Sequence, residues 1–325
     1  MDEIDSSVNS VTVIGSGNMG SSIAEVMAFN GYEVTLIDLD EKLLERGKKN
    51  IERVLQSNFK FAEGRAEKEI YKIESMGINL TEDQKTTIRK KFPKGDPDSQ
   101  ARDIMKKVHA TTDYSEAADS EFVFEAVFEK MEVKRDLFRK LSGILPEKTI
   151  VASNTSSLSI TEIAGSYSRP ENTVIAHFFN PPYTLPLVEI VPGLRTSDST
   201  VDRVISFISG LRNHRTSMAP IRVRESPGFV VNRILVPMIN EAIALYGEGI
   251  ASKEDIDRAM KLGAGMPMGP LELADMVGLD ILLDVAEVFV KDFGDQKYRA
   301  PYNLKRMVAA GDNGRKSGKG FYDYR

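Results

Sequence analysis

The chain has 325 residues, of which 41% are hydrophobic and 28% charged, so it is long enough to bury two ordinary globular cores. Its formal net charge of −5 leaves no basic excess for neutralising phosphates, which argues against a nucleic-acid partner. With 0 cysteines and 3 histidines, the sequence excludes disulfides and thiolate metal sites and predicts no metal centre. No apolar run approaches the roughly 20 residues of a membrane-spanning helix, and the acidic start MDEIDSSVNS lacks a signal-peptide pattern. We therefore expect a cytoplasmic protein with no membrane partner.

Short runs rich in β-branched residues alternate with helical segments over the first two-thirds of the chain. They predict strands at residues 11–15, 32–38, 121–127, 149–155, 172–179 and 187–191. Strand–helix–strand alternation is typical of a parallel sheet that helices cover on both faces. The expected fold class is therefore α/β, with a Rossmann-like doubly wound sheet at the N-terminal end.

Two other regions have helical composition. A charged stretch at about 41–107 predicts a helical hairpin inserted into the sheet domain, broken by a loop at 92–99 that is rich in Pro, Gly and Asp. After residue 224 the apolar residues follow a helical period, which predicts an all-helical second domain. We expect the domains at 1–223 and 224–325.

A glycine pattern between the first strand and the helix after it points to a nucleotide. Gly15, Gly17 and Gly20 form G-x-G-x-x-G, in which the glycines allow a tight turn, close approach to a pyrophosphate and close helix–strand packing. Asp38 ends the second strand about 20 residues later, where an acid binds the ribose 2′-hydroxyl. No arginine neighbours it to receive a 2′-phosphate, so the motif favours NAD over NADP. The alternative is a glycine turn in an α/β domain that binds no nucleotide.

Two ionisable residues stand in apolar, strand-like sequence, His177 in NTVIAHFF and Glu189 in LVEIV. Ionisable groups enter such surroundings with a partner, and each is the other's candidate partner. His177 lies near the carboxyl end of its expected strand, the edge where open α/β sheets bind ligands. A histidine that a carboxylate holds in one tautomer suits an enzyme that takes a hydroxyl proton while hydride leaves to NAD.

The chain resembles the L-3-hydroxyacyl-CoA dehydrogenase family, which includes the 3-hydroxybutyryl-CoA dehydrogenases. The resemblance covers nearly the whole chain, through VIGSGNMG, EAVFEKMEVKRDLF, ASNTSSLSIT, HFFNP, LVEIV, SPGFVVNRILVP, ASKEDIDRAMKLGAGMPMGPLELADMVGLD and GKGFYDY. It implies an acyl-CoA substrate and a homodimer through the C-terminal helical domain. It also implies a role in fatty acid metabolism and beta-oxidation.

The resemblance also implies roles for particular residues. His177 would be the catalytic base, Glu189 would orient it, and Ser156 and Asn232 would contact the reacting oxygen. The cofactor-binding positions would be Gly15, Gly17, Asn18, Met19, Gly20, Asp38, Glu129, Lys134, Asn180 and Lys316.

Several of these residues have a simpler interpretation. Ser156 could cap a helix, Glu129 and Lys134 could form a solvated helix face, and Asn232 could make a hydrogen bond between domains. Lys316 lies in a glycine-rich stretch that we expect to be mobile.

The sequence also departs from the family pattern. Pro186 occupies a position where many relatives carry lysine, and the charged hairpin is longer than expected. The basic cluster IRKKFPK in that hairpin is either a contact for CoA phosphates or a solvated face. Two other functions stay open: a dehydrogenase of a free hydroxy acid, as in gulonate-oxidising relatives, and a cofactor-binding protein without activity, as in lens crystallins.

Overall fold

The computed structural model describes residues 8–91 and 96–325, with the Glu63 side chain excepted. The chain divides into two compact units, Met1–Arg224 and Glu225–Arg325, which are described separately below.

The described part of the N-terminal unit contains an eight-stranded sheet in the order β3-β2-β1-β4-β5-β6-β7-β8. Its strands are β1 Ser10–Ile14, β2 Glu33–Ile37, β3 Val108–Thr111, β4 Phe122–Glu125, β5 Ile150–Ser153, β6 Thr173–Phe178, β7 Leu187–Pro192 and β8 Ala219–Arg222. The six predicted strands are present, and β3 and β8 are two short strands that the sequence analysis missed. The six neighbouring strands β3-β2-β1-β4-β5-β6 are all parallel to one another, as predicted.

The sheet departs from the expected parallel arrangement at one strand pair in the described residues, where β7 runs antiparallel to β6. A parallel return needs a crossover of about a dozen residues or more, usually a helix. Only residues 179–186 join β6 to β7, and they contain no helix, so the chain has to turn back on itself.

Helices cover both faces of the sheet, which confirms the doubly wound fold. Strands β4 and β5 are buried throughout, as expected for strands covered on both faces. Helices α1, α2 and α8 form one hydrophobic core with the strands. Helix α7 contacts β6 and β7, and the buried apolar side chains of α6 and α7 lie outside that core. These helices are α1 Asn18–Phe29, α2 Glu41–Glu63, α6 Met131–Leu141, α7 Ile160–Ala164 and α8 Asp198–Gly210, and the short 3-10 helices η1 Tyr114–Asp119 and η2 Pro170–Asn172 connect the strands.

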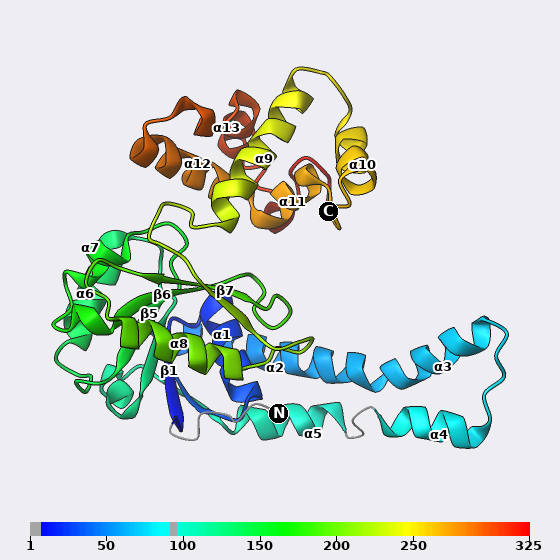
Figure 1. Cartoon of the computed structure of the whole chain (residues 1–325), viewed down its shortest axis with the longest axis horizontal. Coiled ribbons are helices and arrows are strands. Elements are labelled where there is room, and N and C mark those ends of the chain that lie inside the picture. The colour runs from blue at the N-terminus through cyan, green and yellow to red at the C-terminus, as the bar shows by residue number, and fades with distance from the viewer. Residues whose placement is uncertain (1–7, 92–95) are drawn as a thin grey trace. The chain divides into compact units, whose positions relative to one another are not determined.

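The predicted hairpin is an arm of four helices, α2 with α3 Arg65–Ser75, α4 Glu82–Lys90 and α5 Pro97–Met105. Figure 1 shows α2 and α3 running outward from the sheet and α4 and α5 returning. The chain reverses near Gly77, where φ is +84°, and a capping box on Thr81 starts α4. The loop expected at 92–99 was predicted to extend too far, because its last three residues already belong to α5. Pro97 is the first residue of that helix, a position where the missing backbone N–H of proline loses no hydrogen bond. Residues 92–95 lie outside the described residues.

The described part of the C-terminal unit is helical, as predicted. It consists of α9 Val231–Gly247, α10 Lys253–Gly263, α11 Pro270–Val277, α12 Leu279–Phe293 and α13 Tyr302–Ala309, with the short 3-10 helices η3 Gln296–Tyr298 and η4 Arg315–Ser317. Its own core joins α9, α11 and α12 through residues such as Ile239, Leu271 and Phe289. None of the helices in the described residues is long and apolar enough to cross a membrane.

Candidate active site

The glycine loop after β1 has the geometry of a phosphate cradle. Gly15 adopts φ +99°, a conformation open to glycine, and Ala126 lies against its Cα. A Cβ on Gly20 would overlap the carbonyl oxygen of Gly15, so only glycine lets α1 start this close to the strand. A Cβ on Gly17 would instead enter open space in front of α1, whose first two residues are Asn18 and Met19. The loop therefore leaves room for phosphates at the amino end of α1.

Asp38, directly after β2, reaches across to this loop. The backbone N–H and the hydroxyl of Ser16 both donate to Oδ2 of Asp38, at 2.6 Å each, and the N–H of Leu39 donates to Oδ1 at 2.7 Å. A carboxylate can accept about four hydrogen bonds, so Oδ1 retains capacity for a ribose hydroxyl. The residues present thus fit a dinucleotide with an unphosphorylated ribose.

His177 and Glu189 are directly opposite residues of β6 and β7. Nδ1 of His177 lies 2.9 Å from Oε2 of Glu189, and the two residues are 7% and 0% exposed. An ionised carboxylate can only accept a hydrogen bond, so the neutral imidazole tautomer that fits this contact has its proton on Nδ1 and its lone pair on Nε2. The ring of Phe179 packs on the imidazole at 4.6 Å between centroids. The pair has the arrangement of a base and the carboxylate that orients it.

Lys134, on α6, is not part of a solvated helix face, because its side chain is only 1% exposed. Nζ of Lys134 lies 2.6 Å from Oε1 of Glu125, the last residue of β4, and 3.3 Å from Oε2 of Glu129. Burial by itself would lower the pKa of Lys134, but the charges of Glu125 and Glu129 outweigh it and raise that pKa above its ordinary value. The lysine therefore holds two carboxylates with a buried positive charge.

Glu129 connects Lys134 to the loop after β5 through hydrogen bonds. Its Oε1 accepts from the hydroxyl of Thr155, from the N–H of Ser156 at 3.1 Å and from the hydroxyl of Ser157 at 3.1 Å. Ser156 is therefore fixed through its backbone, and the helix cap in this segment is Ser159, which accepts from the N–H of Glu162.

The residues predicted in the N-terminal unit gather at one edge of the sheet. The glycine loop, Asp38, Ser156 and His177 all lie at or just after the carboxyl ends of parallel strands, which share one edge. Oδ1 of Asn154 accepts from the N–H of Phe178 at 2.9 Å and so fastens the loop after β5 to the end of β6. Asn180 is exposed two residues past the end of β6.

The other two predicted site residues belong to the C-terminal unit. Asn232 is the second residue of α9 and half-buried. Lys316, in η4, places Nζ 2.5 Å from Oδ2 of Asp280 in the first turn of α12. After this lysine, Asp275 of α11 accepts hydrogen bonds from the N–H groups of Phe321 and Tyr322.

Comparison with known proteins identifies the family. Residues 10–89 and 65–225 match the model described as "3-hydroxyacyl-CoA dehydrogenase, NAD binding domain", and residues 228–324 match "3-hydroxyacyl-CoA dehydrogenase, C-terminal domain". The chain belongs to the 3-hydroxyacyl-CoA dehydrogenase family. Its N-terminal unit is accordingly an NAD-binding domain, which confirms the cofactor expected from the glycine motif, and the protein is an oxidoreductase.

Similar proteins match this member of the family over almost their full length. The "3-hydroxybutyryl-CoA dehydrogenase" of Clostridioides difficile is 41% identical, over 97% of this chain and 99% of its own. The "Hydroxyacyl-coenzyme A dehydrogenase, mitochondrial" of Homo sapiens is 39% identical, over 98% of this chain and 92% of its own. The crystal structure of (S)-3-hydroxybutyryl-CoA dehydrogenase PaaH1 from Ralstonia eutropha is 38% identical, covers 98% of this chain and 99% of its own, and superposes with a TM-score of 0.77.

Two residues of this family member's site were missed by the sequence analysis. Glu125 stands in the apolar run EFVFEAV, the same signal that singled out Glu189, and it could have been found in that way. Ser16 gave no such signal, because a serine between two glycines is ordinary turn sequence, and only the fold brings it to Asp38.

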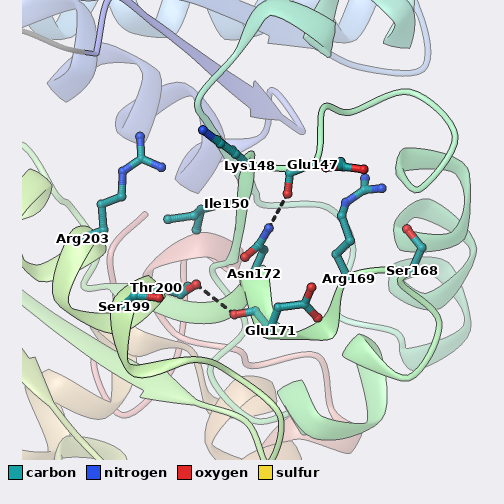
Figure 2. Close-up of a pocket in the computed structure, with 10 residues that line it drawn as sticks. All are labelled: Glu147, Lys148, Ile150, Ser168, Arg169, Glu171, Asn172, Ser199, Thr200 and Arg203. Carbon is teal, nitrogen blue, oxygen red and sulfur yellow. Dashed lines mark hydrogen bonds between the residues drawn. The ribbon is translucent and has the colours of Figure 1, made fainter.

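A surface pocket of about 600 Å³ lies away from this chemistry. Ile150 begins β5 and Asn172 directly precedes β6, so the pocket opens at the amino edge of the sheet, opposite to His177. Figure 2 shows its lining, in which Nδ2 of Asn172 donates to the carbonyl of Glu147. Its charged residues have both signs: Glu147, Lys148, Arg169, Glu171 and Arg203. The described residues contain no group of three or more histidine or carboxylate side chains that could hold a metal ion.

Proposed function

We propose that this chain is an NAD-dependent (S)-3-hydroxyacyl-CoA dehydrogenase that acts on short acyl chains, such as 3-hydroxybutyryl-CoA. The observation that carries the proposal is the buried His177–Glu189 pair at the carboxyl edge of an NAD-binding sheet. The name of the similar protein from Clostridioides difficile supports the choice of substrate.

In the proposed reaction, bound NAD would supply the acceptor for the hydride that leaves carbon 3 of the substrate. His177 accepts the proton of the 3-hydroxyl at Nε2, and Glu189 stabilises the imidazolium that forms. In the opposite direction His177 returns the proton to the 3-keto oxygen. Ser156 and Asn232 donate hydrogen bonds to that oxygen, on which negative charge develops.

We propose that Asp38, Glu129, Lys134, Asn180 and Lys316 serve the cofactor. Asp38 would accept from the ribose, for which its Oδ1 has capacity. Glu129 and Lys134 form an ion pair, and Glu129 accepts a hydrogen bond from the N–H of Ser156. The two residues would therefore act on the cofactor mainly by fixing the loop that carries Ser156.

The test is a set of initial rates of NADH oxidation with acetoacetyl-CoA, acetoacetate and a longer 3-ketoacyl-CoA, repeated with NADPH. We expect acetoacetyl-CoA with NADH to be used best. A preference for free acetoacetate would favour the hydroxy-acid function instead, and no turnover with any ketone would favour a protein that only binds the cofactor.

The His177→Gln variant tests the catalytic assignment. Turnover should fall by about 10²–10⁴-fold with NADH affinity nearly unchanged, because a proton acceptor is lost and the fold is not. The matched control is His109→Gln, which alters an exposed histidine that lies 2.7 Å from Glu116. Equal turnover in the His177 variant and the control would refute the role of His177.

We also propose a cytoplasmic homodimer formed through the C-terminal unit. The 0 cysteines of the chain are compatible with a reducing compartment. Ile234 of α9 and Ile281 of α12 are 67% and 45% exposed, and apolar side chains of this kind support a subunit contact. Light scattering at several protein concentrations would measure the molecular mass, and a monomer at all of them would contradict the dimer.

A further inference from the structure

A second buried histidine–glutamate pair lies in the N-terminal unit, apart from the catalytic pair. Nε2 of His214 is 2.7 Å from Oε1 of Glu25, and the side chains are 3% and 1% exposed. Glu25 lies in the middle of α1, and His214 lies in the segment between α8 and β8. Burial raises the pKa of Glu25, although the hydrogen bond to His214 acts in the opposite direction.

Burying this pair costs free energy, because two of its polar atoms lose their contact with water. Oε2 of Glu25 and Nδ1 of His214 are buried and have no hydrogen-bond partner in the described structure. The ring of Phe29 packs edge-on against His214 at 4.4 Å between centroids, so the surroundings would suit an apolar side chain. A buried ionisable pair of this kind is weak evidence for added stability, so we ask what the pair positions.

The pair belongs to a set of contacts, here called the bridge, in which residues 212–214 join α1 to the turn after β6. The N–H of His214 donates to the carbonyl of Tyr183 at 3.2 Å, and Nδ2 of Asn213 donates to the carbonyl of Pro182 at 3.3 Å. On the other side, Asn30 at the end of α1 makes two hydrogen bonds with the backbone of Arg212, at 2.8 and 2.9 Å.

The bridge spans elements that the sheet keeps apart. Strand β1, which precedes α1, and strand β6, which leads to Asn180, are separated by β4 and β5, or about 14 Å at the usual strand spacing. The turn at residues 181–185 directly follows Asn180. Packing of α1 on β1 and β2 therefore cannot set the position of Asn180 by itself.

We propose that Glu25 and His214 are positioning residues that hold the Asn180 turn in register with the phosphate-binding end of α1, and so set the affinity for NAD. The inference rests on the proposed contact between Asn180 and the cofactor. It needs no assumption about the acyl substrate, so binding of NADH alone tests it.

The main test is a fluorescence titration of NADH into the Glu25→Leu/His214→Phe double variant, which replaces the pair with apolar groups of similar size. Removing both partners avoids an unpaired buried charge, so we expect the melting temperature to be retained or raised. The dissociation constant for NADH should rise about three- to tenfold, the effect of one hydrogen bond's net contribution. Unchanged affinity in the folded double variant would overturn the proposal.

Two further variants separate positioning from charge. Glu25→Gln keeps a hydrogen bond to His214 without the carboxylate, so its NADH affinity should remain near that of the wild type. A loss in this variant equal to that in the double variant would also overturn the proposal, because charge and not position would then matter. His109→Gln at the exposed pair should change nothing.

Asn30→Ala keeps the proposal falsifiable if the double variant does not fold. It removes the two hydrogen bonds to Arg212 at a less buried position and should weaken NADH binding about two- to threefold. A folded Asn30→Ala protein with wild-type affinity would then refute the bridge.

Discussion

Replacing Lys134 with methionine should destabilise the N-terminal unit strongly. Methionine fills most of the lysine's volume but leaves Glu125 without its cation, and Glu125 is 0% exposed. Among the described residues, the carboxylate would keep two donors, the hydroxyl of Ser153 at 2.6 Å and the N–H of Val127 at 2.8 Å. Breaking a buried ion pair in this way costs about 3–5 kcal/mol. For a domain of about 200 residues this corresponds to a melting temperature lower by about 6–20 °C.

Thermal and urea unfolding, each followed by circular dichroism, would measure the loss. Lys130→Met is the matched control, because Lys130 precedes the same helix and is exposed, so its effect should stay within about 0.5 kcal/mol. A Glu125→Met/Lys134→Met double variant should recover most of the stability, because neither charge remains buried. The reasoning fails if Lys134→Met unfolds at the same temperature and urea concentration as Lys130→Met.

Two other predictions follow from local geometry. Gly17→Ala should leave the melting temperature unchanged but weaken NADH binding, because the methyl group enters the open space in front of α1. Gly20→Ala should destabilise the unit by about 3 kcal/mol or more, because its methyl group would overlap the carbonyl oxygen of Gly15. Equal melting temperatures for the two variants would contradict this. The raised pKa of Lys134 means that its charge stabilises the fold below the unfolded lysine value of about 10.4, and that this contribution is lost as pH rises through the folded value. The difference in unfolding free energy between wild type and Lys134→Met should therefore shrink above about pH 10.4, and a difference that grows there would show the opposite sign.

Much of the fold could be predicted because local patterns encode it. Apolar β-branched runs, the glycine motif and the helical period after residue 224 each act over a few residues, and each predicted element is present. The missed strands β3 and β8 have four residues each, and β8 is largely exposed, so neither produces an apolar run. The antiparallel β7 was missed because composition does not encode strand direction.

The candidate site divides in the same way. His177 and Glu189 were noticeable as ionisable residues in apolar runs, and Asp38 by its distance from the glycines. The simpler interpretation of Lys134 as a solvated residue was wrong, because a charged helix looks the same in sequence whether or not a buried carboxylate faces it. Ser16 likewise becomes a partner of Asp38 only when β1 and β2 lie side by side.

The amino-acid sequence by itself determined the six longer or more apolar strands, the glycine motif and the residue types that this chemistry needs. Only the tertiary structure decided which ionisable groups meet. His177 faces Glu189 because β7 turns back along β6, and Glu25 meets His214, 189 positions later, because the sheet order brings α1 to the segment before β8. The reason is physical: a side chain's tendency to be buried follows from its own chemistry and its neighbours, whereas its partner follows from the path of the whole chain.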